Sequence, residues 1–179
     1  MKRGEKELQG IAKDVKLLIL DVDGVLTDGS IILDNEGNEF KIFNVRDGHG
    51  IKMLVKAGIW VALITGRHSK VVERRARELG ITEVYQRCHI KTVAFDHIIE
   101  KYGLTEKEVA YVGDDIVDIP IFKRVGVPIA VSDAADEARD HAAVVTRHRG
   151  GRGAVREVCD FLLKAKGLWE SVTKEYFEA

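Results

Sequence analysis

Leu17-Leu18-Ile19-Leu20-Asp21-Val22-Asp23-Gly24 joins an unbroken apolar run to two acidic residues and a glycine. The apolar run has no helical spacing, so it predicts a strand buried on both faces, as in a parallel sheet. Ligands bind open α/β sheets at the carboxyl ends of the strands, where Asp21 and Asp23 lie. The glycine permits a tight turn that directs both carboxylates toward one point. The alternative is a solvated turn or a helix N-cap, the commoner use of such acids.

Patterns typical of strands and helices alternate along the rest of the chain. This alternation predicts a single α/β domain over residues 1–179, a three-layer Rossmann-like parallel sheet with helices on both faces. The segment Arg46-Asp47-Gly48-His49-Gly50 leads into a helix that ends at Gly58. Strands are also predicted at 59–64, 83–85, 109–112, 128–131 and 143–145, and helices at 69–79, 91–102, 119–125 and 134–140.

Two segments stand outside this alternation. Residues 30–43 hold two short β-type runs around the turn Asp34-Asn35-Glu36-Gly37-Asn38, which predicts a β-hairpin. Such a hairpin is too small to be stable alone, so its apolar face must pack on something, and an oligomer contact is one candidate. Residues from about 152 to 179 predict a C-terminal helical tail with an apolar stripe.

Composition excludes several classes of function. The formal net charge of -1 over 179 residues gives no electrostatic reason to expect nucleic acid or an anionic membrane as partner. Cys88 and Cys159 have no metal-ligand spacing, so we expect reduced thiols. No apolar run is long enough to span a membrane, and residues 1–14 are charged rather than signal-like. We therefore predict a cytoplasmic protein.

Polar groups follow several predicted strands or begin predicted helices. Carboxylates collected at one edge of a sheet repel one another unless a cation neutralises them, and their hard oxygen ligands suit Mg²⁺. A lysine and a threonine hydroxyl could then hold a phosphoryl group. Together these are the functional groups that phosphoryl transfer requires. The residues are Asp21, Asp23, Thr65, Lys91, Asp114, Asp115 and Asp118.

Four motifs in this set resemble those of the haloacid dehalogenase-like phosphohydrolases, in the order that the family has them. They are Asp21-Val22-Asp23-Gly24-Val25-Leu26-Thr27, Ile64-Thr65-Gly66-Arg67, Lys91, and Gly113-Asp114-Asp115-Ile116-Val117-Asp118. The resemblance covers about residues 16 to 145, and four ordered motifs make coincidence a poor explanation.

The resemblance implies a role for each motif residue. Asp21 would be the nucleophile that forms an aspartyl-phosphate, and Asp23 the general acid and then the base. Thr65 and Lys91 would hold the phosphoryl oxygens. The expected Mg²⁺ ligands are the Asp21 carboxylate, the Asp23 backbone carbonyl and Asp114, with Asp115 or Asp118 supporting them indirectly.

Intervals between the motifs leave no room for a folded lid domain, because only 44 positions separate Asp21 from Thr65. Another part of the protein must exclude water from the reaction. The hairpin and the segment 147–153, contributed by neighbouring subunits, are the candidates. This organisation resembles the capless, tetrameric subgroup that acts on phosphorylated octulosonate and nonulosonate sugar acids. It implies a homotetramer whose active sites are covered by neighbouring subunits.

The run from Arg149 to Glu157 resembles the C-terminal signature of 3-deoxy-D-manno-octulosonate 8-phosphate phosphatases, which act in lipopolysaccharide precursor synthesis. Arginines match carboxylates in a fork geometry, so Arg67, Arg152 and Arg156 are candidates for the substrate carboxylate. Gly66, next to Arg67, is a further candidate for binding substrate. N-acylneuraminate 9-phosphate is the rival substrate. The chain departs from the pattern in one loop, where Arg87 and Cys88 replace the expected small, glycine-bearing residues.

Other interpretations remain open. A phosphoacceptor receiver domain uses similar groups, but it expects the phosphorylated aspartate on the third strand, where this chain has Tyr85. A non-catalytic regulatory member is also possible. Individually, Thr65 or Asp118 could be a helix cap and Lys91 a solvated lysine. The arginines could be surface charges. The histidines His49, His89 and His148 have no ligand spacing and are interpreted as surface or pocket lining.

Overall fold

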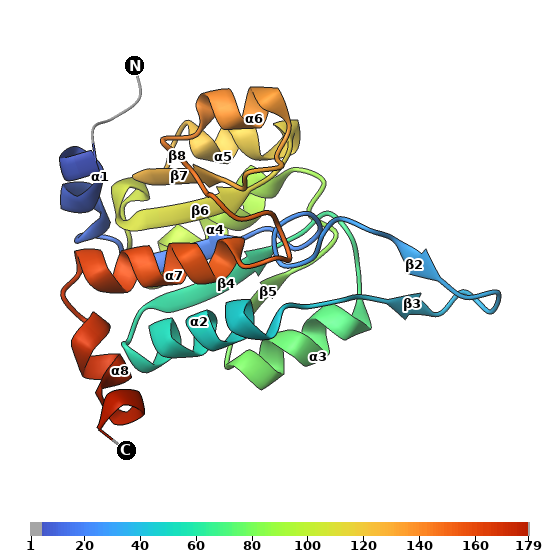
Figure 1. The fold of residues 1–179 in the computed structure, drawn as a ribbon. Helices are drawn as coiled ribbons and strands as arrows, with labels where there is room; N and C mark the ends of the chain where they lie inside the picture. Colours follow the sequence, from blue (N-terminus) through green and yellow to red (C-terminus); the bar gives the residue numbers. More distant parts are fainter. Residues whose placement is uncertain (1–4, 179) are drawn as a thin grey trace.

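The computed structural model describes residues 5–178 and is built on a six-stranded sheet in the order β5-β4-β1-β6-β7-β8 (Figure 1). Every pairing in it is parallel, as predicted. All four residues of the strand that contains Leu17 to Leu20 are buried, and it lies inside the sheet. The strands are β1 (Leu17–Leu20), β4 (Trp60–Ile64), β5 (Glu83–Tyr85), β6 (Val109–Gly113), β7 (Val127–Ala130) and β8 (Val144–Val145).

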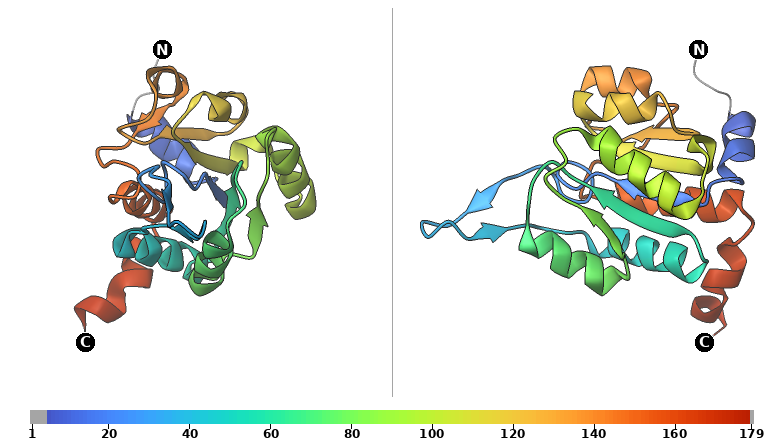
Figure 2. Two further views of the ribbon diagram at one scale, coloured as in Figure 1. Left: turned by 90° about the vertical axis from the view of Figure 1, so that its right-hand side faces the viewer. Right: turned by 180° about the vertical axis from the view of Figure 1, so that it is seen from behind.

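Helices cover both faces of this sheet, which confirms the predicted three layers (Figure 2). The helices α2, α3 and α7 lie on one face, and α4, α5 and α6 on the other (Figures 1 and 2). Within residues 5–178, no helix is both long and apolar enough to cross a membrane. The helices are α1 (Glu5–Ala12), α2 (Val45–Lys56), α3 (Lys70–Leu79), α4 (Lys91–Tyr102), α5 (Ile119–Phe122), α6 (Asp136–His141), α7 (Ala154–Ala165) and α8 (Trp169–Phe177).

Helix α2 begins earlier than the sequence indicated. The segment from Arg46 to Gly50, predicted to lead into the helix, already belongs to it. The Asn44 side chain caps the helix by accepting from the amides of Arg46 and Asp47. This capping satisfies amides that otherwise have no partner and offsets the low helix propensity of the glycines.

The predicted hairpin consists of β2 (Ile32–Leu33) and β3 (Glu39–Phe40), which project from the sheet edge (Figure 1). Both strands are shorter than the runs in the sequence. Its apolar side chains remain open to solvent, as Phe40 is 54% and Ile42 60% exposed. At the other end of the chain, α7 packs beside α2, while Tyr176 and Phe177 of α8 are exposed.

The register of the sheet brings the motif-bearing strand ends together. Leu20 at the end of β1 lies opposite Leu63 on β4 and opposite Val112 on β6. Asp21 follows Leu20 directly, and Thr65 and Asp114 follow two positions after the partners of Leu20. Residues far apart in the sequence therefore share one edge of the sheet.

Candidate active site

The loop after β1, residues 21–29, holds the predicted nucleophile; we call it the nucleophile loop. Asp21 is only 6% exposed, and its amide donates to the Val112 carbonyl. The buried Thr27 hydroxyl closes the loop by accepting from the amides of Gly24 and Gly29. Gly24 has φ of +86°, and a Cβ there would overlap the Asp114 carboxylate. The glycine therefore lets the two acidic strand ends approach each other.

Lys91, the first residue of α4, joins two of the predicted site carboxylates. Its ammonium lies 2.5 Å from Asp21 Oδ2 and 2.7 Å from Asp118 Oδ1, and all three side chains are buried. These charges are compensated because each faces an opposite charge at hydrogen-bond distance. The structure thus places Lys91 beside the predicted nucleophile rather than in solvent.

Both carboxylate oxygens of Asp118 accept hydrogen bonds within this cluster. Its Oδ1 also accepts from the Tyr111 hydroxyl at 2.6 Å, and Oδ2 accepts from the amides of Asp114 and Asp115 at 2.9 and 3.2 Å. The residue is fully buried. With its oxygens already engaged, Asp118 is suited to hold Lys91 and the Asp114 loop rather than to bind an ion itself. Asp115, by contrast, caps the turn at Ile116.

One carboxylate oxygen each of Asp21, Asp114 and Asp118 lies within 4.8 Å of the other two, and Asp21 and Asp114 are the members of this set suited to bind a cation. Burial and the charges of Asp21 and Asp118 raise the pKa of Asp114 to about 7. Burial also raises the pKa of Asp21 to about 6, although Lys91 opposes the shift. Lys91 therefore offsets only part of the cost of burying these ionised carboxylates, and Mg²⁺, which prefers hard oxygen ligands, would supply further positive charge.

The stability of the metal-free protein should depend on pH because of these two groups. In the folded protein the pKa values of Asp21 and Asp114 lie above the ordinary value of 3.8, so both carboxyls bind protons more tightly than in the unfolded chain. Their ionisation therefore destabilises the fold above pH 7, and stability should rise as the pH falls from 8 to 5. The slope is up to about 1.4 kcal/mol per pH unit for each proton taken up. Denaturation in EDTA should show this slope, and saturating Mg²⁺ should flatten it. Equal slopes in both conditions would contradict the cation site.

Thr65 lies at the carboxyl end of β4, almost fully buried. Its hydroxyl accepts from the Arg67 amide at 3.4 Å, and its carbonyl accepts from the Cys88 amide. The loop that carries Cys88 also contains Arg87, whose φ is +58°. Within the described part of the chain, this is the one non-glycine residue with positive φ, so Arg87 adopts a conformation that favours glycine. Arg87, where the chain departs from the family pattern, therefore has a backbone conformation that glycine adopts easily.

Sequence reasoning missed two site residues on the hairpin. The Lys41 ammonium forms an ion pair with Asp23, and its side chain is 2% exposed. Glu39 lies 3.4 Å from Lys41 and 3.2 Å from Arg67, which is itself 3.8 Å from Asp23. The predicted acid and base therefore belongs to a network of alternating charges. The sequence did not identify Lys41 as a site residue, because its position in the predicted hairpin is that of any lysine on a strand.

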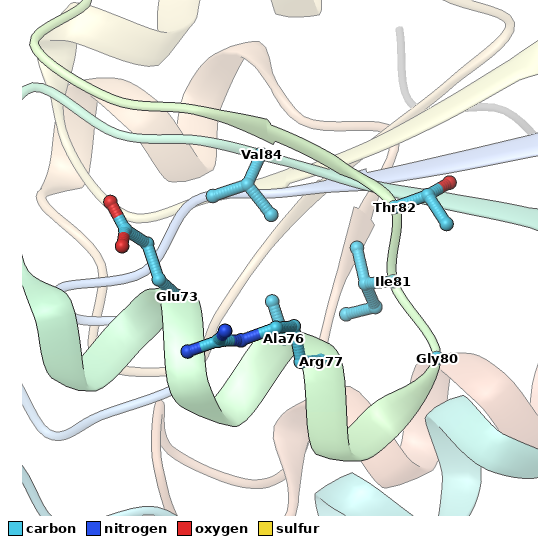
Figure 3. Close-up of a pocket in the computed structure, with 7 residues that line it drawn as sticks. All are labelled: Glu73, Ala76, Arg77, Gly80, Ile81, Thr82 and Val84. Carbon is cyan, nitrogen blue, oxygen red and sulfur yellow. The ribbon is translucent and has the colours of Figure 1, made fainter.

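The predicted substrate arginines do not surround one point. Arg152 pairs with Asp28 at 3.2 Å, and Arg156 with Asp160 at 2.7 Å. Both line a groove of about 920 Å³ between the amino-terminal end of α2 and the length of α7, and Arg67 does not. A smaller hollow of about 460 Å³ between α3 and β5 contains none of the predicted site residues (Figure 3).

Known proteins share this fold and much of its sequence. A family profile described as haloacid dehalogenase-like hydrolase matches residues 78–158. The 3-deoxy-D-manno-octulosonate 8-phosphate phosphatase KdsC of Escherichia coli (strain K12) is 53% identical over 156 residues, which are 87% of this chain and 83% of the relative. The crystal structure of the phosphatase from Yersinia pestis has 47% identity and a TM-score of 0.91, and the match covers 92% of this chain and 89% of that one.

A further relative was solved with ligands. The structure of the 3-deoxy-D-manno-octulosonate 8-phosphate phosphatase of Moraxella catarrhalis contains a magnesium ion, a phosphate ion and KDO. It matches with a TM-score of 0.94 and 39% identity, covering 97% of this chain and 99% of that chain. These similarities confirm the family resemblance that the four motifs predicted. The chain therefore belongs to the haloacid dehalogenase-like hydrolases and, among them, to the 3-deoxy-D-manno-octulosonate 8-phosphate phosphatase family.

Proposed function

We propose that this protein is a Mg²⁺-dependent phosphatase that hydrolyses 3-deoxy-D-manno-octulosonate 8-phosphate to the free sugar acid and phosphate, a step in lipopolysaccharide precursor synthesis. The observation that carries the proposal is the buried pair of Asp21 and Lys91 beside Asp114, in a chain 53% identical to such a phosphatase. The receiver-like alternative does not account for the family, and the non-catalytic alternative does not account for competent residues at every motif position.

Asp21 is the nucleophile in this mechanism. One carboxylate oxygen attacks phosphorus, and the bond from phosphorus to the sugar oxygen breaks to leave an aspartyl-phosphate. Lys91, held by Asp118, and the Thr65 hydroxyl face the phosphoryl oxygens and offset their charge. The aspartate is pre-oriented, since Oδ1 accepts from the Val22 amide at 2.6 Å.

Asp23 transfers the protons. It donates one to the leaving sugar oxygen, and it then accepts one from the water that attacks phosphorus and releases Asp21. Lys41 and Arg67 hold the Asp23 carboxylate in place, which supports a single orientation for both steps.

The residues suited to hold Mg²⁺ are Asp21 and Asp114 through their carboxylates and Asp23 through its backbone carbonyl. Bound there, the ion would neutralise charge on the phosphoryl group. Asp118 supports this set by fixing the amides of Asp114 and Asp115.

The substrate carboxylate lies at the end opposite the phosphate, and we assign it to arginine. Arg67, next to Gly66, is nearest the reacting groups because it contacts Asp23. Arg152 and Arg156 line the groove between α2 and α7, and a neighbouring subunit could bring this groove to the site. Bidentate pairing with a carboxylate suits each guanidinium.

Phosphate release from a panel of sugar phosphates with Mg²⁺ tests the proposal. We expect kcat/KM to be highest for 3-deoxy-D-manno-octulosonate 8-phosphate, with N-acetylneuraminate 9-phosphate as the comparison and glucose 6-phosphate as the control. A higher value for the neuraminate ester would move the substrate to that class. No release from any ester would refute the phosphatase assignment.

We further propose a homotetramer in which the hairpin covers a neighbouring active site. Ile31, Leu33, Phe40 and Ile42 expose apolar surface on a hairpin too small to be stable alone, so burial against another copy would stabilise them. A cytoplasmic location is consistent with the free thiols of the two cysteines.

Replacing two of these side chains should dissociate the oligomer. The double variant Phe40→Ser and Ile42→Ser removes apolar area that we expect to be buried between copies, so light scattering should report a smaller particle and kcat should fall. Val93→Ser on α4, at a side chain that is 66% exposed, is the matched control and should change neither. An unchanged particle in the double variant would exclude the hairpin from the interface.

A further inference from the structure

Asp47 is a buried carboxylate that the mechanism above does not use. It lies in the first turn of α2 and is only 1% exposed. Its Oδ1 accepts from the Arg156 amide at 2.7 Å and its Oδ2 from the Gly153 amide at 3.3 Å. These amides begin α7, whose N-cap residue Gly153 has no side chain to cap with. Helix α2 therefore supplies the cap that α7 lacks.

The segment that precedes α7, Arg147 to Gly153, is held by two further carboxylates; we call it the glycine loop. Glu157 accepts from the amides of Arg147 and His148 at 3.0 and 3.2 Å. Asp133 accepts from the Gly150 amide at 2.9 Å. With Asp47 at its far end, the loop is fixed at its start, its middle and its end.

The glycine loop packs directly against the nucleophile loop. The Gly151 amide donates to the Val25 carbonyl at 2.9 Å. A Cβ at Gly150 would overlap the Gly24 carbonyl, and one at Gly151 would lie 2.5 Å from the Thr27 carbonyl carbon. This approach is possible only because positions 150 and 151 carry no side chains. A displacement of the glycine loop would therefore also move the nucleophile loop, which carries Asp21.

Helix α2 is in turn held closely against α7. A Cβ at Gly50 would lie 3.0 Å from Cys159 Cβ and 3.0 Å from Arg156 Cδ. Two helices this close cannot slide independently, because interiors are close-packed. The cap that Asp47 provides thus has a fixed position relative to α7.

We propose that Asp47 is a positioning residue for the phosphatase reaction: by capping α7 it holds the glycine loop against the nucleophile loop and keeps Asp21 aimed at phosphorus. This inference rests on the proposed function. Misplacing a reacting group by about 1 Å can cost about 100-fold in rate, so a distant cap can affect the chemical step. Since Asp47 itself touches no reacting group, substrate binding should be affected much less.

The test compares Asp47→Ala, the conservative Asp47→Asn and the control Glu108→Gln. Glu108 also caps a backbone amide, that of Thr105, but it precedes β6 at the opposite edge of the sheet. The measurements are kcat and KM with the preferred sugar phosphate, inhibition by orthovanadate as a transition-state probe, and the melting temperature. Because an alanine at a buried position can prevent folding, Asp133→Ala provides a second variant at an exposed side chain.

We expect Asp47→Ala to lower kcat about 10- to 100-fold and orthovanadate affinity by a similar factor, with KM within about threefold. Asp47→Asn keeps one acceptor oxygen and should recover most of the loss, and Asp133→Ala should lower kcat about threefold. Glu108→Gln should lower the melting temperature without changing kcat. If the aspartate variants lose stability but keep kcat within about twofold, or if only KM rises, the proposal is wrong. An inactive wild-type enzyme would instead refute the proposed function.

Discussion

Asp21→Asn should reduce phosphate release by at least about 10⁴-fold, because the amide is a poor nucleophile and cannot form the acyl phosphate. The fold should survive this change. Asparagine has the size of aspartate, and its single side-chain oxygen can still accept from the Lys91 ammonium, which Asp118 also holds. Steady-state turnover and single-turnover phosphorylation should therefore fail together, while the circular dichroism spectrum stays that of the wild type.

The matched control for this variant is Asp14→Asn. Asp14 lies before β1, at the end of the strand remote from the site, and it is exposed. Its replacement should leave kcat unchanged. If Asp21→Asn kept even a tenth of the wild-type kcat, another residue would have to be the nucleophile, and the alignment of the four motifs with the family would be wrong.

The parts of the fold that depend on local sequence could be predicted. Four consecutive apolar residues before Asp21 are sufficient to define a strand buried on both faces, and α4 has the predicted bounds, Lys91 to Tyr102. The convergence of the site acids followed from the position of each at a strand end. Parallel strands place such ends at one edge, whatever their separation in the chain.

The early start of α2 could not be predicted from periodicity, because tertiary contacts support it in addition to the local Asn44 cap. Gly48 and Gly50 disfavour a helix in isolation, yet Gly50 permits the close approach of α7 and Asp47 binds amides of that helix. Neither contact partner is near in sequence, so periodicity gave no indication of them.

The hydrogen-bond partners of the site were hidden for a similar reason. Tyr111 reads as an ordinary core residue of β6, but its hydroxyl donates to Asp118. Lys41 alternates with Phe40 and Ile42 on a hairpin whose orientation the sequence does not define. Folding brings Lys41 to Asp23, the proposed general acid and base, and the ion pair holds that carboxylate in place.

Lys91→Met should be the most destabilising single substitution in the site. It removes the cation from a buried cluster and leaves Asp21 and Asp118 facing each other without compensation. Breaking a buried ion pair in this way costs about 3–5 kcal/mol. Activity should also fall by about 10²- to 10³-fold, because a donor to the phosphoryl oxygens is lost.

The loss of stability in Lys91→Met should depend on pH with a definite sign. Lys91 lowers the pKa of Asp21, so its removal makes that carboxyl bind a proton still more tightly in the folded state. The variant should consequently recover stability on acidification more steeply than the wild type, and the difference between them should shrink from pH 8 to pH 5. Urea denaturation in EDTA at both values measures it. Lys56→Met breaks an exposed pair with Glu175 and should have little effect at either pH, so a Lys91→Met variant that behaved like this control would show that the buried lysine does not compensate the site acids.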